Sequence, residues 1–340
     1  FTLAGFYSGA GAADIKVGAL NDMTGATSDV GKDYALGIAE AIHYVNDNGG
    51  VNGKKIKLYQ FDYGYRIPEA LTKYKLFKRL GTVAVLGWGT GDTEALSPTI
   101  TKDQMPYVSA SYSAHLTDPK KTPYNLFAAT DYSTNARAAI TAWFDKKWPQ
   151  HTDYGKRKPR FVCSYHFAHP YCSAPIKAIK DQAEILGFEI GPDQNVTLTA
   201  IDTKSQVLAM KDFKADLVWH GNTTMSVSAT LRDSYSLGLG AAHIINNWGF
   251  DENLPRLAGE AAEGADPQPP AAVAVERPHP VVGEARGIVR IVAEVLEGGV
   301  VRRPAAGGDA IEPGAVRPQL SVPRTESMIS TSVSVVVPVF

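Results

Sequence analysis

The stretch VAVLGWGTGDTEALSPTITKDQMPYVSASYSAHLT, residues 83–117, decides the fold of this chain. It predicts a buried strand over residues 83–88, a glycine-rich turn, a short helix and a second strand over residues 106–111. The turn leaves backbone N–H groups free at the start of the helix, where the helix dipole favours an anion such as a carboxylate. The candidate binding residues of this turn are Thr90, Gly91, Asp92 and Thr93.

The second strand of this stretch ends in small hydroxyl side chains, Ser109, Ser111 and Ser113. Ligands of an open parallel sheet bind at the carboxyl ends of its strands, so both loops are expected to face one crevice. A dinucleotide fingerprint would look similar, but the third glycine of G-x-G-x-x-G is missing. Two ordinary strand–helix connections without a ligand remain the alternative.

Length and charge narrow the class of protein. The chain has 340 residues, enough for two domains, and a formal net charge of −1, which gives no basic footprint for nucleic acid. Residues 1–12 are apolar and small and end in Ala10-Gly11-Ala12. This predicts the remnant of a secretory signal peptide and a periplasmic location, with a disordered extension as the alternative.

Strands and helices alternate along most of the chain, which predicts an α/β fold with parallel sheets covered on both faces. The first unit is expected over residues 13–130 and the second over residues 131–250. The second begins with a helical pattern over residues 134–148. The further strands are expected over residues 15–20, 56–61, 160–165, 216–220 and 244–248, and the further helices near residues 173–186, 205–213 and 225–237.

Several blocks in a fixed order carry a family resemblance. Residues 13–58, ADIKVGALNDMTGATSDVGKDYALGIAEAIHYVNDNGGVNGKKIKL, resemble the opening of type I periplasmic substrate-binding proteins, more narrowly the branched-chain amino-acid-type receptors of ABC importers. Further similar blocks are VLGWGTGDT, SASYSA and LAGEAAEG, the last at residues 257–264. The resemblance covers about residues 13–264. It implies two Rossmann-like lobes, joined by a hinge, that close over a small ligand.

The resemblance also implies what such a protein does. It would be a monomeric receptor, not an enzyme, without cofactor or metal, and it would deliver its ligand to the permease and ATPase of an ABC importer. A ligand-sensing regulatory module of the same fold is the alternative. An αβ enzyme is a third possibility, but no H-E-x-x-H, Walker A or G-x-S-x-G motif occurs.

Site residues follow from the resemblance, position by position. In the family, the turn Thr90 to Thr93 and the hydroxyls of Ser111 and Ser113 bind the ligand's carboxylate. The residues that the resemblance implies in the second lobe are Tyr171, Asn222, Thr223 and Asn247.

The Asn247 position departs from the family pattern. Amino-acid receptors commonly have an acidic residue there to neutralise the ligand's ammonium group, and asparagine supplies no charge. Asp92 could compensate only if it faces the cleft. An uncharged carboxamide beside Trp248, with Trp88 opposite, favours a ligand that lacks an ammonium group: a small organic acid, an amide or an aromatic carboxylate.

Cysteine and histidine recur every third residue at Cys163, His166, His169 and Cys172. A metal site is disfavoured because residues i and i+3 of a strand point to opposite faces. A disulfide between the two cysteines is possible in an exported protein, and unpaired structural residues are the remaining interpretation. His220, at a strand end, is interpreted as a satisfied histidine of the core or rim. The turn of residues 62–65, Asp-Tyr-Gly-Tyr, either lines the edge of the first lobe or forms a surface turn.

The composition changes after Gly264. Residues 251–264 are expected to return towards the first lobe, but residues 265–340 contain no Lys, Trp, Tyr or Cys and are rich in Pro, Ala, Val, Gly and Arg. Nothing in this tail matches the family. We interpret it as the product of a frameshift in GC-rich coding DNA, with a divergent or disordered extension as the alternative.

Overall fold

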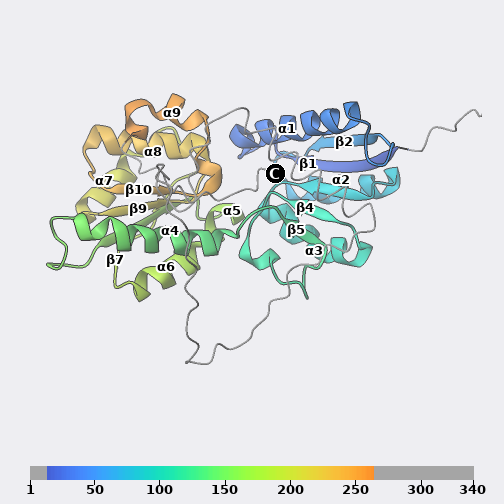
Figure 1. Cartoon of the computed structure of the whole chain (residues 1–340). Helices are drawn as coiled ribbons and strands as arrows, with labels where there is room; N and C mark the ends of the chain where they lie inside the picture. Colours follow the sequence, from blue (N-terminus) through green and yellow to red (C-terminus); the bar gives the residue numbers. More distant parts are fainter. Residues whose placement is uncertain (1–13, 264–340) are drawn as a thin grey trace, which may run out of the picture.

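Two parallel sheets organise the residues that the computed structural model describes, 14–263 (Figure 1). The first sheet lies in lobe I, which comprises residues 14–130, and the second lies in lobe II, which comprises residues 131–263. Figure 1 shows α1 above the first sheet and α3 below it, and α8 above the second sheet with α4 and α6 below it. The predicted α/β class with parallel sheets is confirmed.

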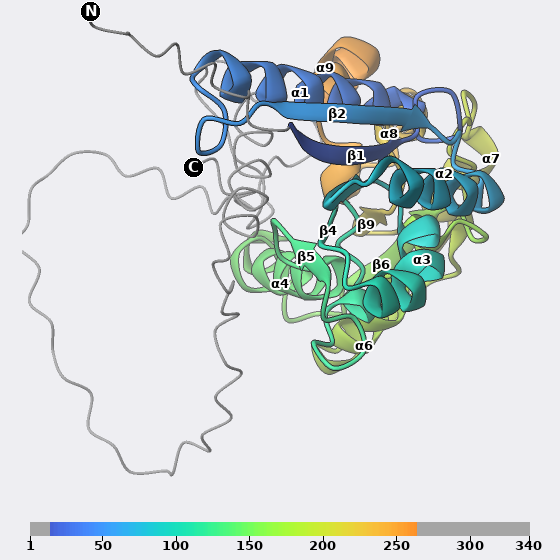
Figure 2. The same cartoon turned by 90° about the vertical axis from the view of Figure 1, so that its right-hand side faces the viewer.

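Lobe I has the strand order β2-β1-β3-β4-β5, and every pair in it is parallel. Figure 2 shows α1 lying along β2 and β1. The carboxyl ends of β1, β3 and β4 therefore meet at one edge, where the loops that follow them gather. The elements of lobe I are β1 (Ile15–Asn21), α1 (Ser28–Asp47), β2 (Ile56–Asp62), α2 (Ile67–Leu80), β3 (Ala84–Gly87), α3 (Thr90–Asp103), β4 (Tyr107–Ser109), η1 (Ala114–Leu116) and β5 (Asn125–Phe127).

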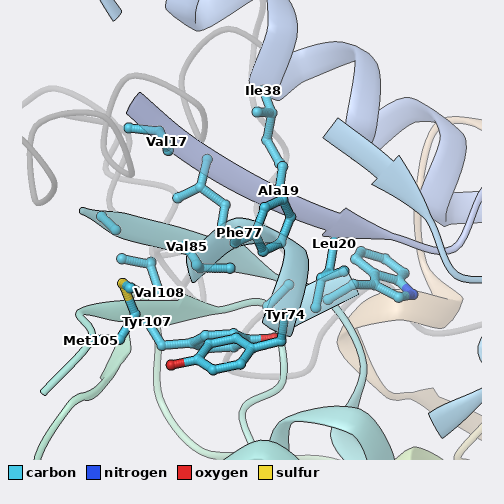
Figure 3. Close-up of a cluster of buried hydrophobic side chains, with 14 of the residues drawn as sticks. Val17, Ala19, Leu20, Ile38, Tyr74, Phe77, Val85, Met105, Tyr107 and Val108 are labelled. Carbon is cyan, nitrogen blue, oxygen red and sulfur yellow. The ribbon is translucent and has the colours of Figure 1, made fainter. Parts of the chain in front are cut away.

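The core of lobe I lies between this sheet and its helices (Figure 3). Ala19 and Val85 of neighbouring strands are fully buried, as is Phe77 of α2. A Cβ atom on Gly18 would come within 2.8 Å of the Phe77 ring, so only glycine lets α2 approach the strand this closely. This close packing fixes β1 and β3, and with them the loops at their carboxyl ends.

Lobe II has the strand order β10-β9-β6-β7, with β8 pairing with a further part of β6, and all pairs are parallel. Its core centres on aromatic side chains such as Phe161 and Trp219. The elements of lobe II are α4 (Tyr132–Lys146), η2 (Trp148–Gln150), β6 (Arg160–Tyr165), α5 (Pro170–Ser173), α6 (Ile176–Ile185), β7 (Glu189–Ile190), β8 (Gln194–Asn195), α7 (Lys204–Phe213), β9 (Leu217–His220), α8 (Thr224–Leu237), β10 (Ala242–Ile245), η3 (Asn247–Gly249), α9 (Asn253–Ala258) and η4 (Gly259–Ala262).

Two boundaries differ from those that the sequence predicted. The supposed turn after β3 is already the first turn of α3, which begins at Thr90 directly after the extended Gly89. The helix expected over residues 173–186 begins later, at Ile176 of α6, after Pro175, which has no N–H to donate, and the short α5 precedes it.

The segment after β10 corrects a further prediction. Residues 251–264 were expected to return towards lobe I, but the described part of this segment packs on lobe II. Leu254, Ala258 and Ala261 are buried against Val227 and Leu231 of α8, since α9 and η4 present their apolar side chains to that helix.

The predicted signal-peptide remnant and the frameshifted tail, residues 1–12 and 265–340, lie outside the described residues. Within residues 14–263, no helix has both the length and the apolar character that crossing a membrane requires.

Candidate functional site

A pocket that is partly open to solvent lies where the two lobes meet; its empty space, about 230 Å³, includes open solvent. The end of β3 and the start of α3 form part of one wall, and the loop after β10 forms part of the opposite wall. Among residues 14–263, none of those that line the pocket carries a charge. Lobe I contributes Thr27, Tyr65, Trp88, Gly89 and Thr90, and lobe II contributes Tyr132, Tyr171, Thr223 and Trp248.

A hydrogen-bonded loop holds the Trp88 side of the cavity. Asp22, buried at the end of β1, accepts hydrogen bonds from the backbone N–H of Gly25 at 2.6 Å and from both the N–H and the hydroxyl of Thr27 at 2.8 Å. The Thr27 hydroxyl in turn accepts from the indole Nε1–H of Trp88 at 2.8 Å. The polar groups of this part of the wall are therefore paired with the protein itself.

Trp248 connects the two lobes across the cavity. It belongs to lobe II, yet it packs against the hydrophobic cores of both lobes. Its ring centroid lies 4.9 Å from that of Trp88 and 6.2 Å from that of Tyr112, both in lobe I. Its Nε1–H donates to the Tyr132 hydroxyl at 3.2 Å. The aromatic wall is thus formed only when the lobes are together.

The Tyr65 side chain reaches the start of α3. Its hydroxyl accepts a hydrogen bond from the backbone N–H of Thr90 at 3.0 Å, and its ring lies 4.4 Å from the His169 ring of lobe II. The ring also lies so close to Gly89 that a Cβ atom there would be 2.7 Å from Tyr65 Cε2. The N–H group of Thr90, which the sequence predicted to be free, is therefore bonded to the Tyr65 hydroxyl.

Asp92 does not face the cavity. Its side chain is fully buried inside lobe I, where Oδ1 accepts a hydrogen bond from the Tyr63 hydroxyl at 2.7 Å. Burial raises the pKa of Asp92 to about 7, against the effect of that hydrogen bond. The carboxyl group cannot act as the counter-charge of a ligand's ammonium group from this position.

Small hydroxyls gather beside Thr90. The hydroxyls of Thr90 and Ser111 are hydrogen-bonded at 2.7 Å, and those of Thr93 and Ser109 at 3.2 Å. The Tyr132 hydroxyl donates to the carbonyl of Ala110 at 3.3 Å. The two loops that the sequence placed at one crevice therefore meet, and only Thr90 among these loop hydroxyls borders the cavity.

The structure brings five of the twelve predicted site residues to the cavity wall, and the others lie behind or beside it. A Cβ atom on Gly91 would be 3.2 Å from Pro170 of α5, so this glycine lets the lobes approach. The hydroxyl of Ser113 donates to Glu94 at 3.1 Å, and Asn222 holds the backbone of His166 and Val196. Asn247 borders Trp248 without lining the cavity. The five are Trp88, Thr90, Tyr171, Thr223 and Trp248.

Four lining residues were missing from the predicted set. Gly89 and Tyr65 lie in stretches that the sequence had singled out, the glycine-rich turn and the tyrosine-containing turn. Nothing in the sequence pointed to Thr27 or Tyr132, because their places depend on how Asp22 folds its loop and on how α4 meets lobe I.

Two hydroxyls of the lobe II wall are buried and make no hydrogen bond of good geometry among the described residues, those of Tyr171 and Thr223. The Asp29 carboxylate lies near the Thr223 hydroxyl, and the Trp248 backbone lies near the Tyr171 hydroxyl. Leaving buried polar groups unpaired costs free energy, so such groups mark places where a ligand or water completes the structure.

One hydrogen bond joins the lobes beside Thr223. Asp29 of α1 accepts from the backbone N–H of Met225, in the first turn of α8, at 3.0 Å. Burial raises the pKa of Asp29, against the effect of this bond. The carboxylate occupies the N-terminus of α8, where the helix dipole favours a negative charge.

The two cysteines and His220 are buried within the described part of the chain. Cys163 and Cys172 are free and buried, which excludes the disulfide, and residues 14–263 hold no cluster of three or more possible metal ligands. His220 is buried and hydrogen-bonded to His243 at 2.9 Å, which confirms the structural interpretation.

Comparison with known proteins identifies the family. A family model described as periplasmic binding protein matches residues 14–267. This chain belongs to the periplasmic binding protein family. The resemblance seen in the sequence is thereby confirmed, and the family consists of substrate-binding proteins rather than enzymes.

Individual relatives agree with this assignment. A Leu/Ile/Val-binding protein of Citrobacter freundii is 22% identical over 255 residues, which are 74% of this chain and 66% of that protein. The solved structure of an ABC transporter substrate-binding protein from Aeropyrum pernix is 32% identical, has a TM-score of 0.66, and covers 85% of this chain and 73% of its own. A solute-binding protein of an ABC transporter from R. palustris, in complex with benzoate, shares the fold with 17% identity and a TM-score of 0.62, over 73% of this chain and 66% of its own. This chain thus spans about two thirds of the length of the curated relative.

Proposed function

We propose that this chain is a periplasmic solute receptor that closes over a small carboxylate without an ammonium group and delivers it to the permease and ATPase of an ABC importer. The observation that carries the proposal is the uncharged lining of the cavity. A buried ammonium group needs a charged or strongly accepting partner, and an unpaired one is costly. The nearby carboxyl groups lie behind the lining and bond to the protein: Asp92 accepts from Tyr63, Asp22 from Thr27, and Asp29 from the Met225 backbone beside Thr223.

An anion is better accommodated than a cation. Thr90, the first residue of α3, borders the cavity, so the positive end of that helix dipole faces the ligand. Hydroxyl groups of Tyr65, Thr90 and Tyr171 are neutral donors that a carboxylate can accept from. The N-terminus of α8 is occupied by Asp29, whereas the Asp92 carboxyl group in the first turn of α3 lies on the interior side, away from the pocket.

The body of the ligand is expected to be apolar. Aromatic side chains dominate the lining, and they favour flat or branched hydrocarbon groups. The benzoate of the R. palustris protein and the leucine, isoleucine and valine that give the Citrobacter relative its name share a carboxylate and a compact apolar group. The aromatic lining residues are Tyr65, Trp88, Tyr132, Tyr171 and Trp248.

Calorimetric titration of the full chain with benzoate, 4-methylpentanoate and leucine tests the proposal. The second acid is leucine without its ammonium group, so the pair isolates that one group. We expect both acids to bind and leucine to bind about 100-fold more weakly, because its ammonium group would be buried unpaired. Tight leucine binding without a response to either acid would overturn the proposed ligand class. Delivery is tested by whether the loaded receptor stimulates ATP hydrolysis by an ABC importer reconstituted with it.

A further inference from the structure

We propose that Tyr65 is a specificity-determining residue of this site. Its hydroxyl donates a hydrogen bond to the ligand's carboxylate, and the N–H group at the start of α3 polarises that hydroxyl. The inference rests on the proposed function, since it assumes a carboxylate in the cavity. It assigns the donor atom to a particular residue, and it explains why the site would bind an anionic head group more tightly than a neutral one.

The backbone of the β2–α2 loop is shaped to place this ring. Tyr65 has φ +54°, a left-handed conformation that bulky residues rarely adopt, and it follows Gly64 with φ +57°. Asp62 holds the loop, accepting from the N–H groups of Met23 and Gly64 at 2.9 Å and from the Thr24 hydroxyl at 2.6 Å. A strained backbone held by several hydrogen bonds is characteristic of a functional site.

The hydroxyl of Tyr65 accepts a hydrogen bond within the protein, but its own proton is not donated to any described residue. Its oxygen accepts from the N–H of Thr90, the first residue of α3, at 3.0 Å. Its own proton has no acceptor among the described residues, and the side chain lines the cavity. Burial raises the pKa of Tyr65 well above its usual range, so the group stays a donor. The acceptor for that proton is therefore expected from the ligand.

The hydrogen bond from the helix strengthens the donor. A hydroxyl that accepts from an N–H group is polarised and donates more strongly, and a donor gains most from an ionised acceptor. Behind Tyr65, the Asp92 carboxyl group occupies the interior side of the same helix turn. Tyr65 is thus the group through which the α3 dipole reaches a ligand.

Replacing Tyr65 with phenylalanine keeps the ring and removes only the hydroxyl. We expect Tyr65→Phe to weaken benzoate binding about 10- to 100-fold, the range for losing a hydrogen bond to a charged group. Binding of benzamide, the neutral analogue of the same shape, should weaken by less than about threefold, since its oxygen carries no full charge. Calorimetry on the full chain measures both affinities, and thermal melting checks that the variant is folded.

Tyr74→Phe is the matched control. The Tyr74 hydroxyl also bonds to α3, at the opposite end, where it donates to Asp103 at 3.2 Å. This variant loses a tyrosine hydroxyl of lobe I without changing the cavity, so both affinities should stay as in the wild type.

Other outcomes contradict the inference in distinguishable ways. Equal losses for benzoate and benzamide would mean that Tyr65 only shapes the cavity. Tighter benzoate binding would mean that the Tyr65 hydroxyl occupies the place of the carboxylate. A wild-type protein that binds leucine but neither acid would overturn the proposed ligand class alone, and the same comparison is then made with leucine and leucinamide. A protein that binds no carboxylate at all would overturn both proposals.

Discussion

The two walls of the cavity differ in how many of their polar groups are hydrogen-bonded within the protein. On the lobe I side, the polar side chains of Thr27, Trp88 and Thr90 are all hydrogen-bonded within the protein. On the lobe II side, the hydroxyls of Tyr171 and Thr223 are buried and make no hydrogen bond of good geometry among the described residues. Apart from the Tyr65 hydroxyl proton, which has no acceptor within residues 14–263, the polar groups of the lobe I wall are therefore hydrogen-bonded, whereas the lobe II wall lacks part of its hydrogen bonding.

This difference indicates an order of events in binding. A wall whose groups are already held loses little conformational freedom when the ligand arrives, so lobe I is suited to receive it first. The unpaired hydroxyls of lobe II gain partners only when the lobes close on an occupied cavity. Ligand contacts would then favour the closed form by their differential affinity for it.

The largest effect is expected from Trp248→Ala. This side chain packs on both hydrophobic cores and forms the aromatic wall with Trp88, so its loss removes the contact that only the closed form makes. Trp248 is partly buried, so its truncation costs less than that of a fully buried tryptophan, about 3–5 kcal/mol. We therefore expect the affinity for benzoate, measured by calorimetry, to fall about 100-fold.

Trp148→Ala separates binding from stability. Trp148 is buried in lobe II with its ring centroid 5.9 Å from that of Trp143, and it does not line the cavity. This variant should melt at a lower temperature but bind as the wild type does. If both variants lose affinity equally, Trp248 acts through the stability of lobe II and not through the cavity.

Two hydroxyl deletions sharpen the contrast between the walls, because their effects on stability should differ in sign. Thr27→Val leaves the Trp88 N–H without its acceptor, so the free energy of unfolding should fall by about 1–3 kcal/mol. Tyr171→Phe removes a buried hydroxyl that makes no hydrogen bond of good geometry within residues 14–263, so the unliganded protein should be as stable or more stable by up to about 1 kcal/mol. Urea unfolding without ligand measures both.

Ligand affinity gives the second half of that comparison. Tyr171→Phe should lower the affinity for benzoate about tenfold, because the carboxylate of the bound ligand then loses the Tyr171 hydroxyl as a hydrogen-bond donor. A protein that becomes less stable and binds unchanged would show that the Tyr171 hydroxyl has a structural partner and that the two walls do not differ.

The sequence predicted the framework of this site and missed its details for physical reasons. Alternating strands and helices placed Trp88 and Thr90 at a strand end, where a ligand of a parallel sheet binds, and both line the cavity. The direction of the Asp92 side chain was not predictable, because it depends on Tyr63 being buried beneath the same turn. The pattern of residue types shows where a loop lies, but not which way its side chains turn.

Tyr65 and Tyr132 illustrate two further limits. A positive φ at a tyrosine leaves no trace in composition or periodicity, so the sequence identified the turn of residues 62–65 without identifying which ring would reach α3. Tyr132 starts the first helix of lobe II, and its contact with the Ala110 carbonyl arises only from the packing of one lobe on the other. Both positions follow from tertiary structure.

The smallest effect is expected from Asp29→Ala, which removes a bond that belongs to neither wall alone. Asp29 of lobe I accepts from Met225 at the start of α8, so the bond exists only when the lobes are closed. A single hydrogen bond near a helix N-terminus contributes about 1 kcal/mol. The affinity for benzoate should therefore fall about fivefold, because the closed form becomes less populated.

The pH dependence tests whether that bond acts through closure. Burial raises the pKa of Asp29 in the closed form, so the closed form binds more protons than an open form in which the group is solvated. Affinity should thus rise as the pH falls from neutral towards that pKa, and Asp29→Ala should lose this part of the dependence. Asp33→Ala is the control, because Asp33 lies one turn further along α1 and is exposed. If both variants keep the wild-type profile, the contact between Asp29 and α8 does not control closure, and the difference between the two walls alone must account for it.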